Sequence, residues 1–250
     1  MYMIRGELPY GGYSAMASAD MKYIKEHGKA WLASGVFHKM HLHLNLVGGT
    51  YDDWMAINML RGVVWQRMGG RITLSQSLAA PHGSEEETRT FYACSRFLLA
   101  AELTNSASML TGFRPALLLT DIDCIFQSNF PIPNRLGLFL RDSIPGTVGW
   151  EAEGTRVAAG IVYVPSGDYH FLRDVASFIE NEHPRWFLDQ VALSRVAQNR
   201  RSAPPHVHVF DNKDMDWEFV PGSKIWTGKG DRKHHNATYL ARKKYYEDMA

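Results

Sequence analysis

Two aspartates one residue apart, Asp121 and Asp123, end an apolar run that begins at Ala116. In an extended segment successive side chains alternate, so both carboxylates are expected on one side while Ile122 points back toward the core. Carboxylate oxygens are the ligands that Mg²⁺ and Mn²⁺ prefer, and such a cation keeps open positions for phosphate oxygens. The pair therefore predicts a divalent-cation site at the end of a buried strand.

A second pair with the same spacing, Asp214 and Asp216, has a different setting. Chance supplies a pattern this short about once in a chain of this length, so the setting has to decide between copies. Asn212 and Lys213 precede the second pair in a polar run, with no apolar strand before it. This copy is predicted to be a solvated turn.

Histidines alternate with apolar residues in two further pairs, His41 with His43 and His206 with His208. Strand alternation places each pair on one face, so a zinc-dependent hydrolase is an alternative. Such an enzyme usually needs eight strand–helix units, and the sequence offers about four before the rhythm fails. A carbohydrate- or protein-binding module without turnover is a third interpretation, because seven tryptophans and many tyrosines permit stacking on sugars.

Size and composition favour one soluble domain. The chain has 250 residues, of which 45% are hydrophobic, and its 27 lysines and arginines nearly cancel its 26 aspartates and glutamates. That balance gives no reason to expect nucleic acid as a partner. No apolar run reaches the roughly eighteen residues that a transmembrane segment needs. Cys94 and Cys124 lie inside apolar segments and indicate no disulfide framework, so a cytoplasmic setting is expected.

Strand and helix patterns alternate through the first half of the chain. Strands are predicted over 13–19, 41–47, 71–75, 116–121, 156–165 and 206–210, and helices over 21–34, 51–68, 86–110, 169–181, 185–198 and 237–250, with a basic loop over 224–233. This order favours an α/β sheet, whose ligands gather at the carboxyl ends of its strands. Asp20 and Asp121 each follow a predicted strand there. Gly160 interrupts another strand, where a missing side chain lets a ligand come close.

The helix over 86–110 has a core-facing stripe of Phe91, Cys94, Leu98 and Ala101. Arg96 points away from that stripe. It is expected either on a solvated face or beside an anion, since a guanidinium offers a fixed fork of donors to phosphate.

Six short segments, taken in order, resemble the glycosyltransferases of the GT-A fold. They span residues 13–20, 92–97, 119–123, 159–163, 188–190 and 226–230, and the resemblance is closest to glycogenin and the galactosyltransferases of lipooligosaccharide synthesis. It implies a single catalytic domain over 1–250, with a Rossmann-like mixed central sheet flanked by helices. A nucleotide-binding half over about 13–126 would precede an acceptor half over about 127–236 and a C-terminal helix over about 237–250.

The resemblance also implies a metal-dependent transfer of sugar from a nucleotide-diphosphate sugar, with a UDP-sugar favoured. The acceptor is left open among a glycan, a lipid-linked glycan and a protein. Asp121 and Asp123 would hold Mn²⁺ or Mg²⁺ against the diphosphate, and Asp189 and Gln190 would lie beneath the transferred sugar as catalytic residues. The implied donor-binding residues are Asp20, Arg96, Thr120, Asp121, Ile122, Asp123, Gly160, Gly228, Lys229 and Lys233.

The sequence departs from these relatives at one metal ligand. Some of them carry a histidine near the C-terminal loop, where this chain has Trp226, with His234 and His235 further along. The third ligand therefore stays open, as does an inactive, transferase-like binding module. Asp20 has an alternative role as the N-cap of the helix that starts at Met21.

Overall fold

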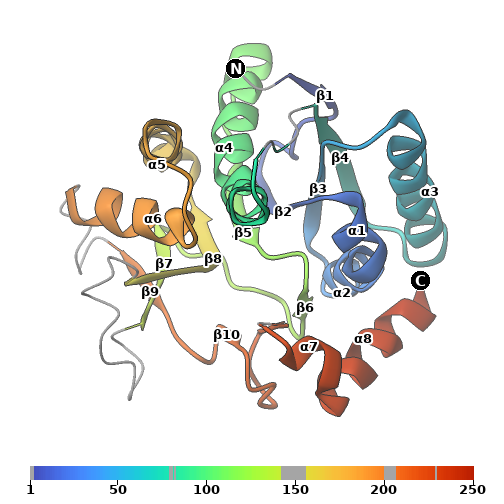
Figure 1. Ribbon diagram of the computed structural model, residues 1–250. Helices are drawn as coiled ribbons and strands as arrows, with labels where there is room; N and C mark the ends of the chain where they lie inside the picture. Colours follow the sequence, from blue (N-terminus) through green and yellow to red (C-terminus); the bar gives the residue numbers. More distant parts are fainter. Residues whose placement is uncertain (1–2, 79–80, 82, 142–155, 200–206, 229) are drawn as a thin grey trace.

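A mixed eight-stranded sheet forms the centre of the computed structural model, which describes residues 3–78, 81, 83–141, 156–199, 207–228 and 230–250 (Figure 1). The strands lie in the order β1 (Ile4–Gly6), β4 (Arg71–Ser77), β3 (His41–Val47), β2 (Tyr13–Ala19), β5 (Ala116–Thr120), β8 (Val157–Val164), β7 (Gly137–Leu140) and β9 (His208–Phe210). The four strands β4, β3, β2 and β5 run parallel, while β1 and β8 pair antiparallel with their neighbours.

Helices cover both faces of this sheet (Figure 1). One face packs against α2 (Lys29–Phe37), α3 (Tyr51–Met68) and α8 (Ala237–Met249), and the other against α4 (Glu85–Thr111), α5 (Tyr169–Asn181) and α6 (Leu188–Asn199). Because both faces are covered, every residue of β5 is buried, as the continuous apolar run predicts. Among the described residues, no helix is long and apolar enough to cross a membrane.

The connections around β2 create a crevice. From β2 the chain runs through α1 (Met21–Tyr23), a π-helical turn (Ile24–Gly28) and α2 to β3 on one side, whereas β5 lies on the other side. In open α/β sheets, ligands bind at the carboxyl ends of strands where the order reverses in this way. Asp20 follows β2 and Asp121 follows β5, so both lie at this reversal point.

A small second sheet closes the end of the crevice. It consists of β10 (Met215–Asp216), β11 (Ile225–Thr227) and β6 (Cys124–Phe126), and β11 is antiparallel to β6 with Thr227 opposite Cys124. The short helix α7 (Arg232–His235) follows and carries Lys233. The prediction of a basic loop over 224–233 is therefore wrong in part, because this segment contains strand β11 and the start of helix α7.

The second Asp-x-Asp pair is another correction. Asp214 and Asp216 are buried, with exposures of 7% and 3%. Lys224 Nζ lies 2.6 Å from Asp214 Oδ1, and the backbone N–H of Val220 donates to Asp216 Oδ2 at 2.7 Å. The predicted solvated turn is wrong because these partners come from the segment that folds back beside the pair and satisfies both carboxylates.

Candidate functional site

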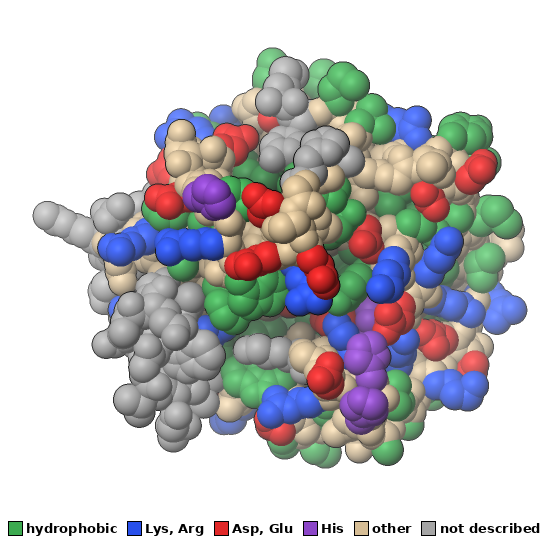
Figure 2. All heavy atoms as spheres, viewed as in Figure 1, with side chains coloured by type: hydrophobic (Ala, Val, Ile, Leu, Met, Phe, Trp, Pro, Cys, Tyr) green, Lys and Arg blue, Asp and Glu red, His purple; other side chains and the backbone are tan. Residues whose placement is uncertain are grey.

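A cavity of about 490 Å³ opens at the carboxyl ends of β2 and β5, a size typical of small-molecule sites. The first half of the chain contributes Ser18, Ala19, Asp20, Tyr23, Arg89, Tyr92, Ala93, Arg96, Asp121, Ile122 and Asp123, and the second half contributes Arg141, Ala158, Ala159, Gly160, Trp186, Phe187, Asp189, Gln190, Met215, Trp217, Thr227, Gly230 and Lys233. The surface around it carries interspersed acidic and basic side chains rather than a field of one sign (Figure 2).

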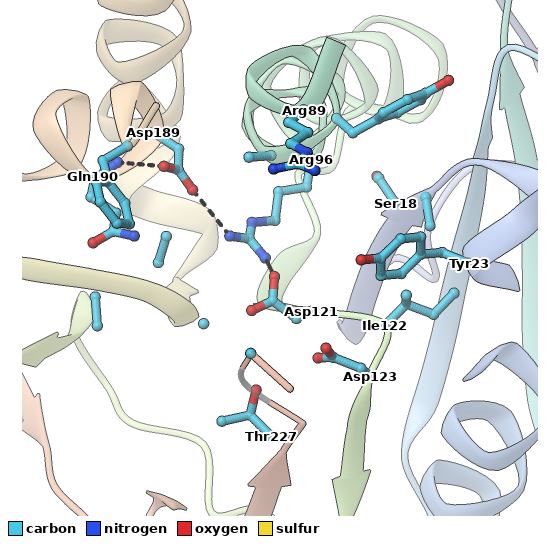
Figure 3. Close-up of a pocket in the computed structure, with 18 of the residues that line it drawn as sticks. Ser18, Tyr23, Arg89, Arg96, Asp121, Ile122, Asp123, Asp189, Gln190 and Thr227 are labelled. Atoms are coloured by element: carbon cyan, nitrogen blue, oxygen red, sulfur yellow. Dashed lines mark hydrogen bonds and ion pairs between the residues drawn. The ribbon is translucent and has the colours of Figure 1, made fainter. Parts of the chain in front are cut away.

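Asp121 and Asp123 both face this cavity (Figure 3), but the predicted strand alternation is wrong, because β5 ends at Thr120 and residues 121–123 form a turn in which Ile122 lines the cavity as well. Each carboxylate has a basic partner on a different element. Arg96 Nη1 on α4 donates to Asp121 Oδ1, and Lys233 Nζ on α7 lies 3.0 Å from Asp123 Oδ2. Helix and strand ends distant in the sequence thus meet at the two aspartates.

Arg96 connects the aspartate pair to α6. It is only 6% exposed, and its second nitrogen, Nη2, lies 3.3 Å from Asp189 Oδ2 (Figure 3). The solvated alternative for Arg96 is therefore wrong. A buried guanidinium requires paired carboxylates to offset the loss of hydration, and Asp121 and Asp189 supply them.

Asp123 offers one ligand oxygen to a divalent cation. Asp123 Oδ1 is buried and has no hydrogen-bond partner among the described residues. Burial first, and then the charge of Asp121, raise the pKa of the Asp123 carboxyl above its usual value. A cation bound at Asp123 Oδ1 would satisfy this oxygen and offset the repulsion between the carboxylates of Asp123 and Asp121. The described residues contain no group of three or more potential ligands, so oxygens of a bound ligand or of water would have to complete the coordination.

Asp20 has the predicted role of a helix N-cap, and its predicted role in donor binding stays a prediction. Its Oδ1 accepts a hydrogen bond from the Tyr23 N–H at 2.8 Å, so it caps α1, and it also lines the cavity. Gly160 lies on the floor of the same cavity. A Cβ added there would lie 3.0 Å from Met215 Sδ and 3.5 Å from Asp121 Oδ2. The missing side chain therefore preserves space beside Asp121 for a ligand.

Asp189 and Gln190 lie in the first turn of α6 and line the cavity (Figure 3). Asp189 Oδ1 accepts from the Gln190 N–H at 2.9 Å, while the Gln190 side-chain oxygen accepts from Arg141. Burial raises the pKa of Asp189, and the charge of Arg96 opposes this rise. Arg96 therefore stabilises the ionised form of Asp189 against the effect of burial.

Two of the implied donor-binding residues, Thr120 and Gly228, do not line the cavity. Thr120 is fully buried, and its hydroxyl oxygen accepts from Trp31 Nε1 at 3.1 Å. Gly228 lies beneath the site, where a Cβ would come within 2.7 Å of Lys233 Cβ, so glycine is required for α7 to approach β11. Lys229 lies outside the described residues.

The histidine pairs do not form a metal centre in the described part of the chain. His43 is fully buried in β3, where its ring nitrogens contact Thr73 Oγ1 at 2.8 Å and Ser75 Oγ at 2.9 Å. It is a core histidine with both nitrogens satisfied. His208 is exposed, and His206 lies outside the described residues. No cluster of three or more potential ligands among His, Cys, Asp and Glu occurs in the described ranges.

Comparison with known proteins extends the description of the fold. No family model and no curated protein matches the sequence. Among solved structures, the apo WbbM bifunctional glycosyltransferase superposes with a TM-score of 0.57 at 10% identity, over 88% of this chain. The chain has a GT-A fold. The match covers 46% of WbbM, so this chain spans less than half of that protein.

A second solved structure is a glycosyltransferase involved in the glycosylation of the major capsid of PBCV-1. It matches with a TM-score of 0.49 at 12% identity, over 93% of this chain and 98% of that one. The eight-stranded sheet of this chain, with its parallel and antiparallel pairs, confirms the predicted mixed central sheet.

Several cavity residues of the GT-A fold were not predicted from the sequence. Trp186, Phe187 and Trp217 look like ordinary aromatic core residues in a linear reading, and Arg141 follows a strand of four residues that carries no periodic signal. Trp186 and Phe187 are adjacent aromatics, separated from the Asp189-Gln190 pair only by Leu188, and this proximity is a signal that could have indicated them.

Proposed function

We propose that this chain is a metal-dependent glycosyltransferase that moves a sugar from a nucleotide-diphosphate sugar to an acceptor. The observation that carries the proposal is the pair Asp121 and Asp123, which faces a cavity at the strand-reversal point. One buried oxygen of Asp123 has no hydrogen-bond partner in the part of the chain that the structure describes. The fold shared with WbbM, a glycosyltransferase, supports the reaction class. The resemblance to glycogenin and the lipooligosaccharide galactosyltransferases favours a UDP-sugar.

In the proposed reaction, Asp121 and Asp123 would hold Mn²⁺ or Mg²⁺. The cation would neutralise charge on the departing nucleoside diphosphate. Lys233, which lines the same cavity beside Asp123, would supply a compact positive charge for the phosphates. Asp20 and Tyr23 at the carboxyl end of β2 bound the end of the cavity that would hold the nucleoside.

The other chemical groups lie on the far side of Arg96. Asp189 and Gln190 would orient the transferred sugar, and the carboxylate of Asp189 would support positive charge that develops at the anomeric carbon. Arg96 would hold Asp189 and Asp121 in one arrangement, since it contacts both. Preorganised charges of this kind need no rearrangement when the reaction occurs.

Ligand-dependent thermal stability tests the proposal. UDP with Mn²⁺ is expected to raise the melting temperature of the wild-type protein, because a ligand that binds only the folded state stabilises it. The shift should be lost in Asp121→Asn and Asp123→Asn, and hydrolysis or transfer from UDP-sugars should fall by at least about a hundredfold, given the several kcal/mol that a catalytic cation supplies.

Asp52→Asn is the matched control, since Asp52 is exposed on α3 and does not line the cavity. It should retain the full shift. GDP in place of UDP separates the donor bases. Equal stabilisation of the wild type and of both active-site variants by Mn²⁺-UDP would contradict the metal assignment.

A further inference from the structure

Two adjacent aromatic side chains line the α6 end of the cavity. Trp186 and Phe187 immediately precede α6, and their ring centroids lie 5.2 Å apart at an interplanar angle of 45°. Trp186 is 48% exposed despite its large apolar surface. We call these two rings the aromatic wall. They precede Asp189 and Gln190 closely in the chain, and Figure 3 shows Asp189 and Gln190 on the opposite side of Arg96 from Ser18 and Tyr23.

The backbone at the aromatic wall is strained. Phe187 has a φ of +66°, in the left-handed region that bulky residues avoid. This conformation is unfavourable for an L-residue, because its Cβ comes too close to the following carbonyl oxygen. Phe187 also starts α6, where its carbonyl accepts from the N–H groups of Gln190 and Val191 at 3.0 Å each. Helices usually begin at Ser, Thr, Asp or Asn, so nothing local favours a phenylalanine here.

The strained residue Phe187 lines the cavity, unlike the other strained residues. Among described residues, the other non-glycine positions with positive φ are Lys39 and Phe219, and neither lines the cavity. Strained residues persist where the surrounding structure holds them, and they concentrate at ligand-binding positions. The backbone N–H of Trp186 also donates to Glu86 Oε1 on α4 at 3.3 Å. The main chain that carries the aromatic wall is therefore attached to α4 as well as to α6.

The chemistry around the aromatic wall matches a sugar ring. A pyranose presents a face of C–H groups and a rim of hydroxyl groups, so it requires an apolar surface with hydrogen-bonding groups at its edge. The aromatic wall supplies the surface, and Asp189, Gln190 and Arg141 line the cavity beside it. A nucleobase could also stack on such rings, but the proposed nucleoside end lies beyond the aspartates, at β2.

We propose that the aromatic wall is the acceptor subsite and that the acceptor presents a hexopyranose ring to it. The proposal rests on the function proposed above, since that function places the donor at Asp121 and Asp123. It narrows the acceptor to a molecule that ends in a sugar, which excludes an unglycosylated protein side chain at this position.

Saturation-transfer NMR on the full chain, with UDP and Mn²⁺ present, tests the subsite without turnover. The probes are methyl β-D-glucopyranoside, methyl β-D-galactopyranoside and methyl α-D-mannopyranoside. At least one should receive saturation through the ring protons of one face. The signal should fall at least fivefold in Trp186→Ala and in Phe187→Gly, while the thermal shift with Mn²⁺-UDP stays that of the wild type.

The variants separate binding from folding. Glycine adopts a positive φ without strain, so Phe187→Gly removes the ring and keeps the backbone conformation. Trp65→Ala is the matched control, because Trp65 is 60% exposed on α3 and does not line the cavity; it should keep the full NMR signal.

The outcomes discriminate between the two proposals. Glycoside signals that persist in both wall variants, or that are missing from the wild type with every probe, would each overturn the subsite, and so would signals that occur only in a parallel measurement without UDP. Wall-dependent glycoside signals in a protein that UDP does not stabilise would support the subsite and contradict the proposed donor.

Discussion

Arg96 is the residue on which the charge balance of the cavity depends. It is buried between Asp121, which follows β5, and Asp189 on α6, and both of these partners come after α4 in the sequence. Removing one member of a buried ion pair leaves the others as uncompensated charges, which costs far more than the pair itself contributes. Arg96 is therefore a positioning residue whose loss affects both the fold and the site.

Arg96→Met is expected to lower the free energy of unfolding by about 3 kcal/mol. Adding Asp189→Asn to the same chain should recover part of this loss, because the unpaired buried carboxylate is removed. Urea unfolding at pH 7 measures both changes. Arg195→Met, on the exposed side of α6, should stay within about 0.5 kcal/mol of the wild type. If Arg96→Met also lowered the free energy of unfolding by less than about 0.5 kcal/mol, the role given to Arg96 would be contradicted.

At the residue scale, the sequence predicted several residues that the fold brings together around one cavity. Asp20, Arg96, Asp121, Ile122, Asp123, Gly160, Asp189, Gln190 and Lys233 were predicted, and all of them line one cavity. What the sequence could not show was their pairing. The contact of Arg96 with Asp189 joins residues 93 positions apart, and no local pattern encodes it.

At the element scale, α8 supports the aspartate pair from behind. The hydroxyl of Tyr239, which is only 1% exposed, donates to the backbone carbonyl of Asp123 at 2.7 Å. The Gly228 N–H donates to the same carbonyl at 3.2 Å. The C-terminal helix thus holds the main chain of a proposed metal ligand, although the helix itself lines no part of the cavity.

Tyr239→Phe is expected to lower the free energy of unfolding by about 1 kcal/mol, because one buried hydrogen bond is lost. The apparent affinity for Mn²⁺-UDP should fall about tenfold, as for other groups that orient metal ligands. Chemical unfolding and isothermal titration measure the two effects. Tyr245→Phe, whose ring is 47% exposed, serves as the control. An unchanged affinity in Tyr239→Phe would show that α8 acts on stability only.

Long elements were predicted well and short ones were not. The strands Tyr13–Ala19 and His41–Val47 and the helices Tyr51–Met68 and Tyr169–Asn181 have the predicted bounds. Their length gives several repeats of period 2 or 3.6, which a local pattern can reveal. By contrast, β6, β7, β10 and β11 have two to four residues each. They exist because distant segments pair with them, and that information is spread over the chain.

At the scale of the whole molecule, buried histidine makes stability depend on pH. Burial lowers the pKa of His43 to about 3, against an ordinary value of about 6.5 in the unfolded chain. Because the folded-state pKa is the lower one, the unfolded chain binds the proton first. The stability that neutral His43 contributes is therefore fully present above pH 6.5, and it is lost as the pH falls from 6.5 toward 3.

Between pH 7 and pH 5, His43 is expected to lower the free energy of unfolding by about 2 kcal/mol. His43→Gln should reduce the pH dependence in this interval by close to one proton, since glutamine does not titrate. Urea unfolding at several pH values gives the slopes. His208→Gln, at an exposed position, provides the comparison. Identical slopes for the wild type and His43→Gln would show that His43 is not the titrating group.

The pairing of β5 with β8 and of β6 with β11 gives the chain a property of its own, because strands from either side of residue 126 are woven into both sheets. A cut at this point would leave each piece with a strand edge that is normally paired and buried. Exposed, unpaired strand edges pair with other chains and cause aggregation. The halves that would hold donor and acceptor are thus not exchangeable modules. A hybrid enzyme made by joining halves from two relatives would have to preserve both strand registers, whereas grafting the segment around Trp186 alone would not.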